Sequence, residues 1–553
     1  MKELLESLLR RGIEGAYQSG KLKTKDVAIV LEAPRDPRHG DLANNAPLVL
    51  AKAEGKAPIT IAEAIREHMD PPPEVEITIA RPGFINFRMA PEYWHAELRR
   101  AAACGPAFVY PQIGAGRTVQ VEFLSANPTG PLTVGHGRNA VLGDTIARLH
   151  SSTGFRVTRE YYFNDGGRQM KLLGQSVHAR YLEELGRPAE LPEDGYQGEY
   201  IREVARSLRA RYGETLVNEA PDAEVFRVAA VEEIFADIRH TCERLGISFD
   251  IYTNELDLIR DGRVQAALDA LRARGLVIER DGALWLNGEA LNLVNKKDQV
   301  LVRSTGEPTY RTPDIAYHID KLRRGFDEIV DVFGADHIAE HEGVIAALRA
   351  LGYDTRPIRA VIYQFVTLTR GGAKVKMSTR RATYVTLDEL IDEVGSDVVR
   401  FFFLFRKHDS HLDFDLDLAK RQAPENPVFY VQYAHARLAS VFREADKAGL
   451  GVADAGTVKL ELLSKEELAL AKKALGITEV VEEAVVALEP HRIPFYLLEL
   501  AGDFHRYYNK PANRIIDPQQ RDLSLARLFL ARVLQYSIAG GLQLLGVTAP
   551  ERM

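Results

Sequence analysis

The feature that most constrains the fold is a strand, a glycine-containing loop and a helix that follow one another within residues 119–154. Val119, Val121 and Phe123 alternate with polar residues, as in a half-buried strand. Residues 125–131 then break the strand, and apolar residues recur at helical spacing beyond them. A helix that starts directly after such a loop directs free backbone N–H groups and the positive end of its dipole at one point. This order predicts a phosphate-binding site at the start of the helix.

Two side chains at the start of this helix add to that prediction. His136 can donate a ring N–H, and Arg138 brings a positive charge. The alternative is that the glycines and the histidine only shape a tight turn, because short glycine patterns are common. The pattern alone leaves both interpretations open.

Composition restricts the class of protein. With 553 residues, 46% apolar and 27% charged, the chain has material for several soluble domains. No apolar run approaches a membrane span, and the N-terminus has the pattern of an amphipathic helix rather than a signal peptide. Cys104 and Cys242 are the only cysteines, which excludes a disulfide framework or a zinc–thiolate site and suits a reducing cytoplasm. The net charge of −7 leaves room only for local nucleic-acid-binding faces.

The order of the expected elements indicates an α/β protein. A strand at 156–163 follows the first helix, and this order implies a doubly wound, Rossmann-type parallel sheet with ligands at the carboxyl ends of its strands. Residues 172–291 are charged and mostly helical in pattern, so we expect a helical insertion in the sheet. Strand patterns resume at 299–303, 328–333 and 359–367.

Three domains are expected. Strands and helices are mixed in the N-terminal region, which includes a helix pattern at 42–53, and this predicts a small α+β domain. The C-terminal region is almost wholly helical in pattern and contains a capping box at Ser464 and Glu467, as in an all-α helical bundle. The expected boundaries are 1–110 for the α+β domain, 111–410 for the sheet domain and 411–553 for the bundle.

Asp314 is a candidate ligand for a cation. It follows a proline and opens a helix pattern, so its structural alternative is an N-cap. Tyr310 and Tyr317 stand four residues before it and three residues after it, so all three side chains would share a face if the segment is helical.

The segment 370–381 is a candidate polyphosphate-binding loop. It contains five cations, two hydroxyl residues and a Gly-Gly pair. Such a loop suits a substrate whose negative charge grows in the transition state. A solvated surface loop is the alternative, since charge runs usually face water.

Aromatic residues beside polar ones are candidates for stacking on unpaired RNA bases. Asn86 lies between Phe84 and Phe87, and several C-terminal tyrosines lie near arginine or histidine. Each aromatic residue could equally belong to a core. The candidate RNA contacts are Asn86, Tyr430, Tyr433, Arg437 and Tyr507.

These motifs together resemble arginyl-tRNA synthetase, a class I aminoacyl-tRNA synthetase family, over essentially the full length. Residues 125–138 resemble the family's HIGH motif, and 376–380 resemble its KMSKS loop. Residues 39–43 and 82–87 resemble the N-terminal domain that contacts the tRNA D-loop. Residues 426–437 and 545–553 resemble the anticodon-binding domain.

The resemblance implies an ATP-dependent ligase. L-Arginine would be activated to arginyl-adenylate and transferred to tRNA(Arg), with release of AMP and diphosphate. Mg²⁺ would accompany ATP, held by phosphates more than by protein, so no protein metal site is expected. The family is usually monomeric, works in the cytoplasm and has no membrane partner.

The resemblance also implies roles for single residues. Catalysis would involve His136, Lys376, Ser378 and Arg380. ATP would contact Thr133, Gly135, His136, Gly137, Lys374, Lys376, Met377 and Ser378. Arginine would contact Glu122, Ser125, Asn127, His136, Tyr310, Asp314 and His337.

Two positions depart from the family pattern. Thr133 stands where the HIGH motif usually begins with histidine, and Thr379 stands where KMSKS often has its second lysine. Both remove positive charge, which Lys374, Lys376 and Arg380 could replace. Loss of one charge-assisted contact worth about 2 kcal/mol would slow activation by roughly thirtyfold.

Three alternatives remain at this stage. The chain could be a class I synthetase for another amino acid, or a nucleotidyltransferase of related fold, which leaves the C-terminal helices without a role. It could also be a non-catalytic RNA-binding paralogue, an alternative that Thr133 makes conceivable.

Overall fold

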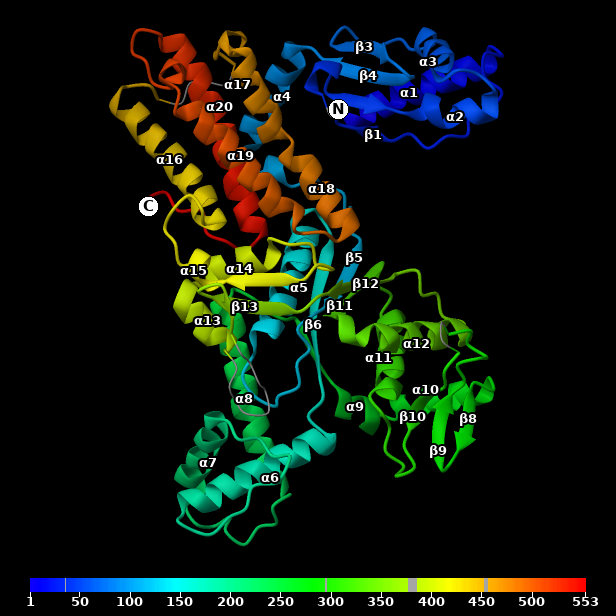
Figure 1. Ribbon diagram of the computed structural model, residues 1–553, viewed down its shortest axis with the longest axis vertical. Coiled ribbons are helices and arrows are strands. Elements are labelled where there is room, and N and C mark those ends of the chain that lie inside the picture. Colours follow the sequence, from blue (N-terminus) through cyan, green and yellow to red (C-terminus); the bar gives the residue numbers. More distant parts are fainter. Residues whose placement is uncertain (35, 294–295, 376–384, 452–455) are drawn as a thin grey trace. The chain divides into compact units, whose positions relative to one another are not determined.

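The computed structural model describes the chain except for residues 35, 294–295, 376–384 and 452–455. Figure 1 labels its helices and strands, and the chain divides into two compact units. The larger unit comprises Ala107–Ser440, Gly476–Asn509 and Gln535–Met553, and the smaller unit comprises Met1–Pro106, Val441–Leu475 and Lys510–Leu534. No helix within the described ranges is both long and apolar enough to cross a membrane.

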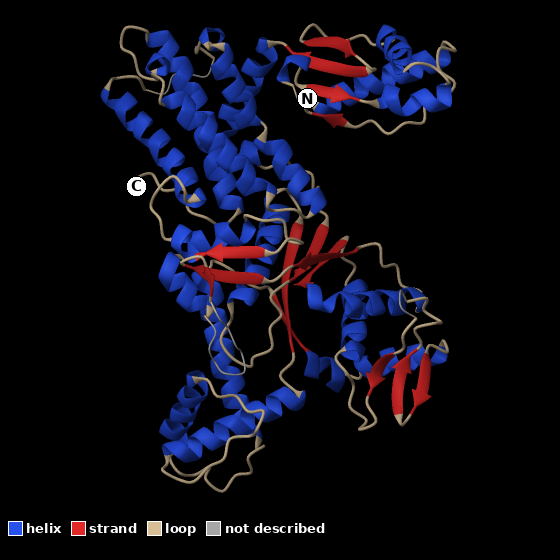
Figure 2. Ribbon diagram, viewed as in Figure 1, coloured by secondary structure: helices blue, strands red, loops and turns tan. Residues whose placement is uncertain are grey.

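The larger unit is built on a five-stranded parallel sheet, drawn in red in Figure 2. Its strand order is β12-β11-β5-β6-β7, and every adjacent pair is parallel. This confirms the predicted doubly wound α/β fold. The strands are β5 (Thr118–Glu122), β6 (Arg156–Phe163), β7 (Ile251–Asn254), β11 (Glu328–Gly334) and β12 (Ile358–Tyr363).

Helix α5 (Val134–Ser152) follows β5, as the strand–loop–helix pattern predicts. It packs closely on the sheet because Gly143 has no side chain: a Cβ there would lie 2.1 Å from Cβ of Phe123. Asn139 fixes the approach, since its side chain accepts from the Leu124 N–H at 2.7 Å and donates to the Val332 carbonyl at 3.1 Å. The start of α5 therefore lies at the carboxyl end of the central strands.

The region 172–291, expected to be a helical insertion, also contributes a strand to the main sheet. It contains β7, which returns to the main sheet beside β6, and the hairpin of β8 and β9, which the sequence did not predict. Its helices are α6 (Gly167–Glu184), α7 (Glu199–Tyr212), α8 (Glu224–Arg244), α9 (Glu255–Arg260) and α10 (Arg263–Ala273).

The expected strand at 299–303 forms, but outside the main sheet. It is β10 (Gln299–Val302), which pairs with β9 (Ala283–Leu286), and β9 pairs with β8 (Val277–Arg280) in a separate antiparallel sheet. The strand prediction for this segment is confirmed, but strand propensity does not specify which strand it pairs with. Helices α11 (Arg311–Arg323) and α12 (Ile338–Ala350) share a buried core with α10 and this small sheet.

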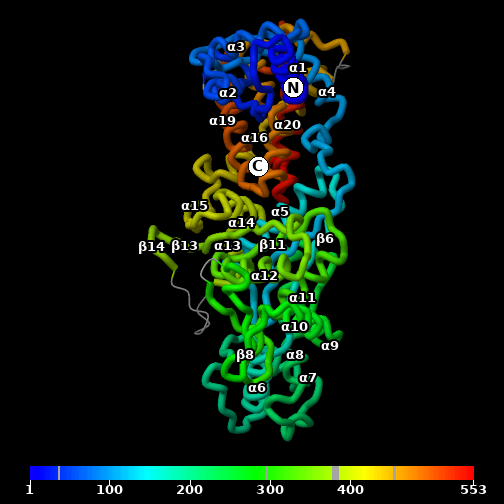
Figure 3. Tube along the Cα trace, turned by 90° about the vertical axis from the view of Figure 1, so that its right-hand side faces the viewer, coloured from blue at the N-terminus to red at the C-terminus, as the bar shows by residue number. Residues whose placement is uncertain are grey.

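The expected strand at 359–367 is two strands, β12 and β13 (Val366–Arg370), separated at residues 364–365. β13 lies between β14 (Ala373–Lys374) and β15 (Leu412–Asp415). Figure 3 shows β13 and β14 at one edge of the larger unit, near α13. The neighbouring helices are α13 (Leu387–Val394), α14 (Ser396–Leu404) and α15 (Leu416–Ala419).

The C-terminal helical prediction is confirmed. Helices α18 (Ile477–Ala487) and α19 (Arg492–Tyr508) lie in the larger unit, whereas α16 (Pro427–Lys447) and α20 (Arg521–Leu544) contribute residues to both units. The capping box also forms, since the Ser464 N–H donates to Glu467 at 2.7 Å and the Glu467 N–H donates to Ser464 Oγ at 3.3 Å. It starts α17 (Lys465–Leu475) in the smaller unit.

The smaller unit contains an antiparallel sheet of order β1-β2-β4-β3 with helices, an α+β arrangement. The expected helix at 42–53 begins only at residue 46, because residues 42–44 pair with β4 and the Asn44 side chain accepts from the Ala46 N–H. The elements are α1 (Lys2–Gln18), β1 (Leu31–Glu32), β2 (Leu42–Asn44), α2 (Ala46–Glu54), α3 (Pro58–Glu67), β3 (Val75–Ala80), β4 (Phe84–Met89) and α4 (Pro91–Cys104).

Candidate active site

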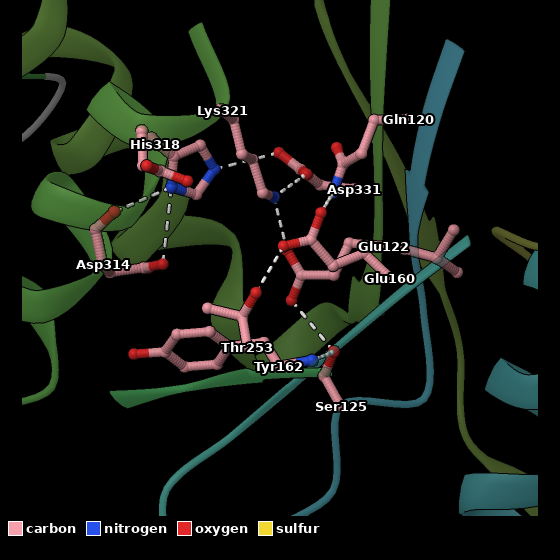
Figure 4. Close-up of polar contacts among 12 residues, drawn as sticks. Gln120, Glu122, Ser125, Glu160, Tyr162, Thr253, Asp314, His318, Lys321 and Asp331 are labelled. Carbon is pink, nitrogen blue, oxygen red and sulfur yellow. Dashed lines mark hydrogen bonds and ion pairs between the residues drawn. The ribbon is translucent and has the colours of Figure 1, made fainter. Parts of the chain in front are cut away.

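A buried ion-pair network lies between the carboxyl end of β5 and the middle of β11 (Figure 4). Glu122 and Asp331 are direct neighbours in the parallel register, which brings both carboxylates to one edge of the sheet. Lys321, on α11, is fully buried and donates to both, with its Nζ 2.6 Å from Asp331 Oδ1. Burial opposes every one of these charges, but Lys321 still holds the pKa of Asp331 well below its usual range.

His318 extends the network toward Asp314. Its Nε2 is 3.0 Å from Asp331 Oδ2, and its Nδ1 is 2.8 Å from the Asp314 carbonyl and 3.4 Å from the Asp314 carboxylate. Burial and Lys321 favour the neutral ring, yet the two aspartates outweigh them and raise the pKa of His318 to about 10. His318 is therefore a cation at neutral pH.

Asp314 is not a helix N-cap. Helix α11 begins at Arg311 with Tyr310 as its N-cap, so the structural alternative for Asp314 is wrong. Its side chain is 36% exposed, whereas Tyr317, one turn later, is fully buried and stacks on Tyr162 with ring centroids 4.5 Å apart. The Asp314 carboxylate is thus partly exposed to solvent, and the residues next to it on α11 are buried.

Tyr310 and His337, both predicted to bind arginine, are brought together by an acid that the sequence did not single out. The Tyr310 hydroxyl donates to Glu340 Oε1 at 2.5 Å, and His337 Nδ1 lies 2.7 Å from Glu340 Oε2. Both side chains are exposed. The two side chains therefore contact the same carboxylate, that of Glu340 in the first turn of α12.

Ser125 and Asn127 line the loop after β5. Ser125 Oγ donates to Glu122 Oε1 at 2.9 Å and accepts from the Tyr162 N–H at 3.2 Å. Asn127 accepts from the Asn164 N–H at 3.0 Å. Both predicted residues thus connect β5 to the end of β6, beside the ion-pair network.

Glu255 is a further acid beside these residues. It is 7% exposed and accepts from the Tyr162 hydroxyl at 2.9 Å and from Asn164 Nδ2 at 2.6 Å. Burial, with repulsion from Asp314, raises the pKa of Glu255 to about 7. Sequence reasoning missed it because it opens the short helix α9, and nothing local distinguishes it from an exposed first-turn acid.

The start of α5 orients His136. The Thr133 N–H donates to His136 Nδ1 at 3.2 Å, and burial lowers the pKa of His136. The ring is therefore neutral and carries its proton on Nε2, which leaves an N–H donor at the helix start. Thr133, the departure from the family pattern, acts as the N-cap of α5.

Gly137 allows another helix to pack against this start. A Cβ at Gly137 would lie 2.6 Å from Leu387 and 2.9 Å from Phe403 side-chain atoms. The Leu387 N–H donates to the Leu132 carbonyl at 2.7 Å, and Thr133 forms a β-bridge with Thr386. Lys374, exposed on β14, belongs to the described residues, whereas Lys376, Met377, Ser378 and Arg380 lie outside them.

His318, Asp331 and His341 are close enough to suggest a metal site. The charges argue against one, because Lys321 and a protonated His318 already compensate Asp331. A divalent cation there would be repelled by both.

The C-terminal RNA candidates form a surface cluster of aromatic and cationic residues in the larger unit. Arg437 lies over the rings of Tyr433 and Tyr508, 4.7 and 4.8 Å from their centroids, and donates to the Tyr433 hydroxyl at 2.9 Å. Tyr430 packs on His505 beside them. In contrast, Tyr507 is 4% exposed, and Asn86, in the smaller unit, is 3% exposed. Their burial favours the core alternative for these two residues.

The comparisons with known proteins agree with this architecture. A family model for the catalytic domain of class I tRNA synthetases (R) matches residues 107–401. The models for the arginyl tRNA synthetase N-terminal domain and the DALR anticodon-binding domain match 3–89 and 431–553. The parallel sheet and the helix start with His136 are thus those of a class I aminoacyl-tRNA synthetase.

Full-length relatives identify the family within the class I aminoacyl-tRNA synthetases. The arginine–tRNA ligase of Desulfotalea psychrophila is 47% identical over 100% of this chain and 99% of its own length. That of Salinibacter ruber is 47% identical over 100% of both chains. The solved Thermus thermophilus arginyl-tRNA synthetase superposes with a TM-score of 0.76 at 26% identity, covering 99% of each chain. The chain belongs to the arginyl-tRNA synthetase family.

Proposed function

We infer that the chain joins arginine to tRNA: it uses ATP to convert L-arginine to arginyl-adenylate, transfers the arginyl group to tRNA(Arg), and releases AMP and diphosphate. Full-length similarity to arginine–tRNA ligases of 47% identity is the observation that carries this conclusion. The alternatives of a nucleotidyltransferase or a synthetase for another amino acid do not account for it.

Arginine binds where acids meet at the carboxyl edge of the sheet. A guanidinium needs planar, paired acceptors, and the half-exposed Asp314 carboxylate supplies them. Asp331 beneath it is already paired with Lys321 and His318, so it supports Asp314 without competing for the substrate. The proposed arginine contacts are Asp314, Tyr310, His337, Glu122, Ser125, Asn127 and His136.

ATP binds at the start of α5. The Gly135 N–H and the Nε2 proton of His136 are donors for its phosphates. The Gly137 N–H is already donated to the Thr133 carbonyl at 3.0 Å, so Gly137 is proposed to line the site without donating to ATP. Lys374, on β14, and Met377 are further proposed ATP contacts, and Lys376, Ser378 and Arg380 are proposed to hold the departing diphosphate. Because Asp331 is already paired with Lys321, Mg²⁺ is proposed as an ion that ATP carries, where it offsets phosphate charge.

The chemistry then needs positioning rather than a covalent enzyme intermediate. The arginine carboxylate attacks the α-phosphorus, the bond to the diphosphate breaks, and diphosphate leaves. The terminal hydroxyl of tRNA next attacks the adenylate carbonyl, and AMP leaves. Both steps are accelerated by orientation and by donors directed at developing negative charge.

The tRNA contacts follow from the predicted domains. We propose that region 1–110 contacts the D-loop and that region 411–553 reads the anticodon, with 111–410 as the catalytic domain. Tyr430, Tyr433 and Arg437 offer a stacking surface. The enzyme would act as a monomer in the cytoplasm.

The test is an ATP–diphosphate exchange assay over a panel of amino acids, with and without tRNA(Arg). We expect arginine to be the one amino acid of the panel that supports exchange. We also expect this exchange to require tRNA(Arg). Exchange with another amino acid would make the chain a different synthetase. Tight tRNA binding without exchange or aminoacylation would make it an RNA-binding paralogue.

A further inference from the structure

Arg138, two residues after His136 on α5, is a buried arginine with unusual partners. Its side chain is 1% exposed. Its guanidinium donates to the backbone carbonyls of Gln364, Ser410 and Lys407, the last two at 3.0 and 3.1 Å. Burial, only partly offset by Tyr363 and Asp409, lowers the pKa of Arg138 to about 10. It remains charged at neutral pH.

The three carbonyls belong to the two segments that support one small sheet. Gln364 lies two residues before β13, and Lys407 and Ser410 lie in the loop between α14 and β15. The segments are joined to each other, since the Gln364 N–H donates to the His408 carbonyl at 2.9 Å and β13 pairs in parallel with β15. Arg138 therefore ties the base of the β14-β13-β15 sheet to the first turns of α5.

The outer strand of that sheet carries a proposed ATP contact. β14 consists of Ala373 and Lys374 and pairs only with β13 among the described strands. Lys374 is paired in register with Thr369 of β13. The position of its ammonium relative to His136 thus depends on how β13 is seated on α5.

We propose that Arg138 is a positioning residue for amino-acid activation: it seats the β13–β14 hairpin on the start of α5, so that Lys374 and His136 address the same polyphosphate. The proposal rests on the proposed function. The planar guanidinium suits this role because its donors reach carbonyls from two segments at once, which a lysine ammonium cannot do in the same geometry. Displacement of a reacting group by about 1 Å can cost on the order of a hundredfold in rate.

The first test is ATP–diphosphate exchange by the full chain with tRNA(Arg), at a temperature where each variant is folded. In Arg138→Met we expect kcat to fall by about a hundredfold while KM for arginine stays within about twofold. Arg138→Lys should fall between Arg138→Met and the wild type. A kcat within about threefold of wild type in Arg138→Met, or a loss seen only in KM for arginine, overturns the proposal.

A matched control separates positioning from stability. Arg400 is also 1% exposed and donates to two backbone carbonyls, of Leu245 and Leu545, and to Asp144, away from the hairpin. Arg400→Met should lower the melting temperature and keep kcat within about threefold. If both variants lose kcat equally, Arg138 only stabilises the fold.

A double-mutant cycle tests the route through the hairpin. Lys374→Met should cost about tenfold in kcat in the wild type and less than about twofold in Arg138→Lys, because Lys374 is already misplaced there. Fully additive losses overturn the proposal even if Arg138→Met fails to fold. An inactive wild type would instead refute the proposed function, so the two failures are distinguishable.

Discussion

Lys321 Nζ lies 2.6 Å from Asp331 Oδ1, and both side chains are buried. This ion pair joins α11 to the middle of the parallel sheet, and α11 also carries Asp314. The carboxylate proposed to bind arginine is therefore carried by a helix that buried ion pairs hold in place. The cost of the arrangement is that each buried charge depends on its partners.

Removal of Lys321 should accordingly destabilise the protein. Lys321→Met leaves Glu122 and Asp331 as neighbouring buried acids, and we expect a loss of about 3–5 kcal/mol in unfolding free energy. Urea unfolding followed by circular dichroism measures it. Lys25→Met, which breaks an exposed pair with Glu14, is the control and should unfold like the wild type. A similar small effect for both variants would show that the network contributes little.

His318 makes the stability depend on pH in a defined direction. Its folded-state pKa of about 10 lies above the ordinary value of 6.5, so protonation favours the folded state. Its contribution is complete below about pH 6.5 and declines as pH rises toward 10. The stability difference between wild type and His318→Gln should shrink over that range, as denaturant midpoints at several pH values can show. A difference that grows with pH would mean that the buried ring is neutral.

The threonine at the head of the HIGH-like motif should be nearly neutral for catalysis. Thr133 contacts His136 through its backbone N–H, and burial already keeps His136 neutral. A second imidazole would therefore add little positive charge. In Thr133→His we expect kcat for arginine activation within about threefold of wild type, equivalent to about 0.7 kcal/mol. A gain of about thirtyfold would show that a charge-assisted phosphate contact is missing.

The two glycines at the start of α5 should respond differently to alanine. At Gly137 the added methyl would meet Leu387 at 2.6 Å, so Gly137→Ala should cost about 1–3 kcal/mol through overpacking. At Gly135 it would meet only Thr133 Oγ1, at 3.7 Å, so stability should be unchanged or slightly higher. The melting temperatures of Gly137→Ala and Gly135→Ala, measured by thermal unfolding, test this difference. Equal melting temperatures would mean that α13 moves away without cost.

Local patterns predicted much of this fold. The strand expected at 156–163 is β6, and the mostly helical pattern of 172–291 includes α7 and α8. The glycine-containing loop correctly placed the start of α5 because its signals lie within a few residues of one another. Pairing partners were harder to predict: β10 has strand character but joins another sheet.

The sequence singled out residues of the candidate site only where a local pattern marked them. Lys321 lies in a charged helix end that resembles a solvated surface, and its partner Glu122 is 199 residues away. The raised pKa of Glu255 comes from burial and from repulsion by Asp314, and both arise only when the chain folds. Asp331 was not singled out from the sequence, although an acid in the middle of an apolar strand indicates a buried partner.

Arginine kinetics of Asp314→Asn test the central claim most directly. The substitution keeps the shape of the side chain and removes the charge proposed to pair with the guanidinium. We expect KM for arginine in tRNA-dependent exchange to rise by at least about tenfold, equivalent to 1.4 kcal/mol, while KM for ATP changes by less than about twofold. An unchanged KM for arginine would remove Asp314 from the pocket and contradict the proposed selection of arginine by this acid.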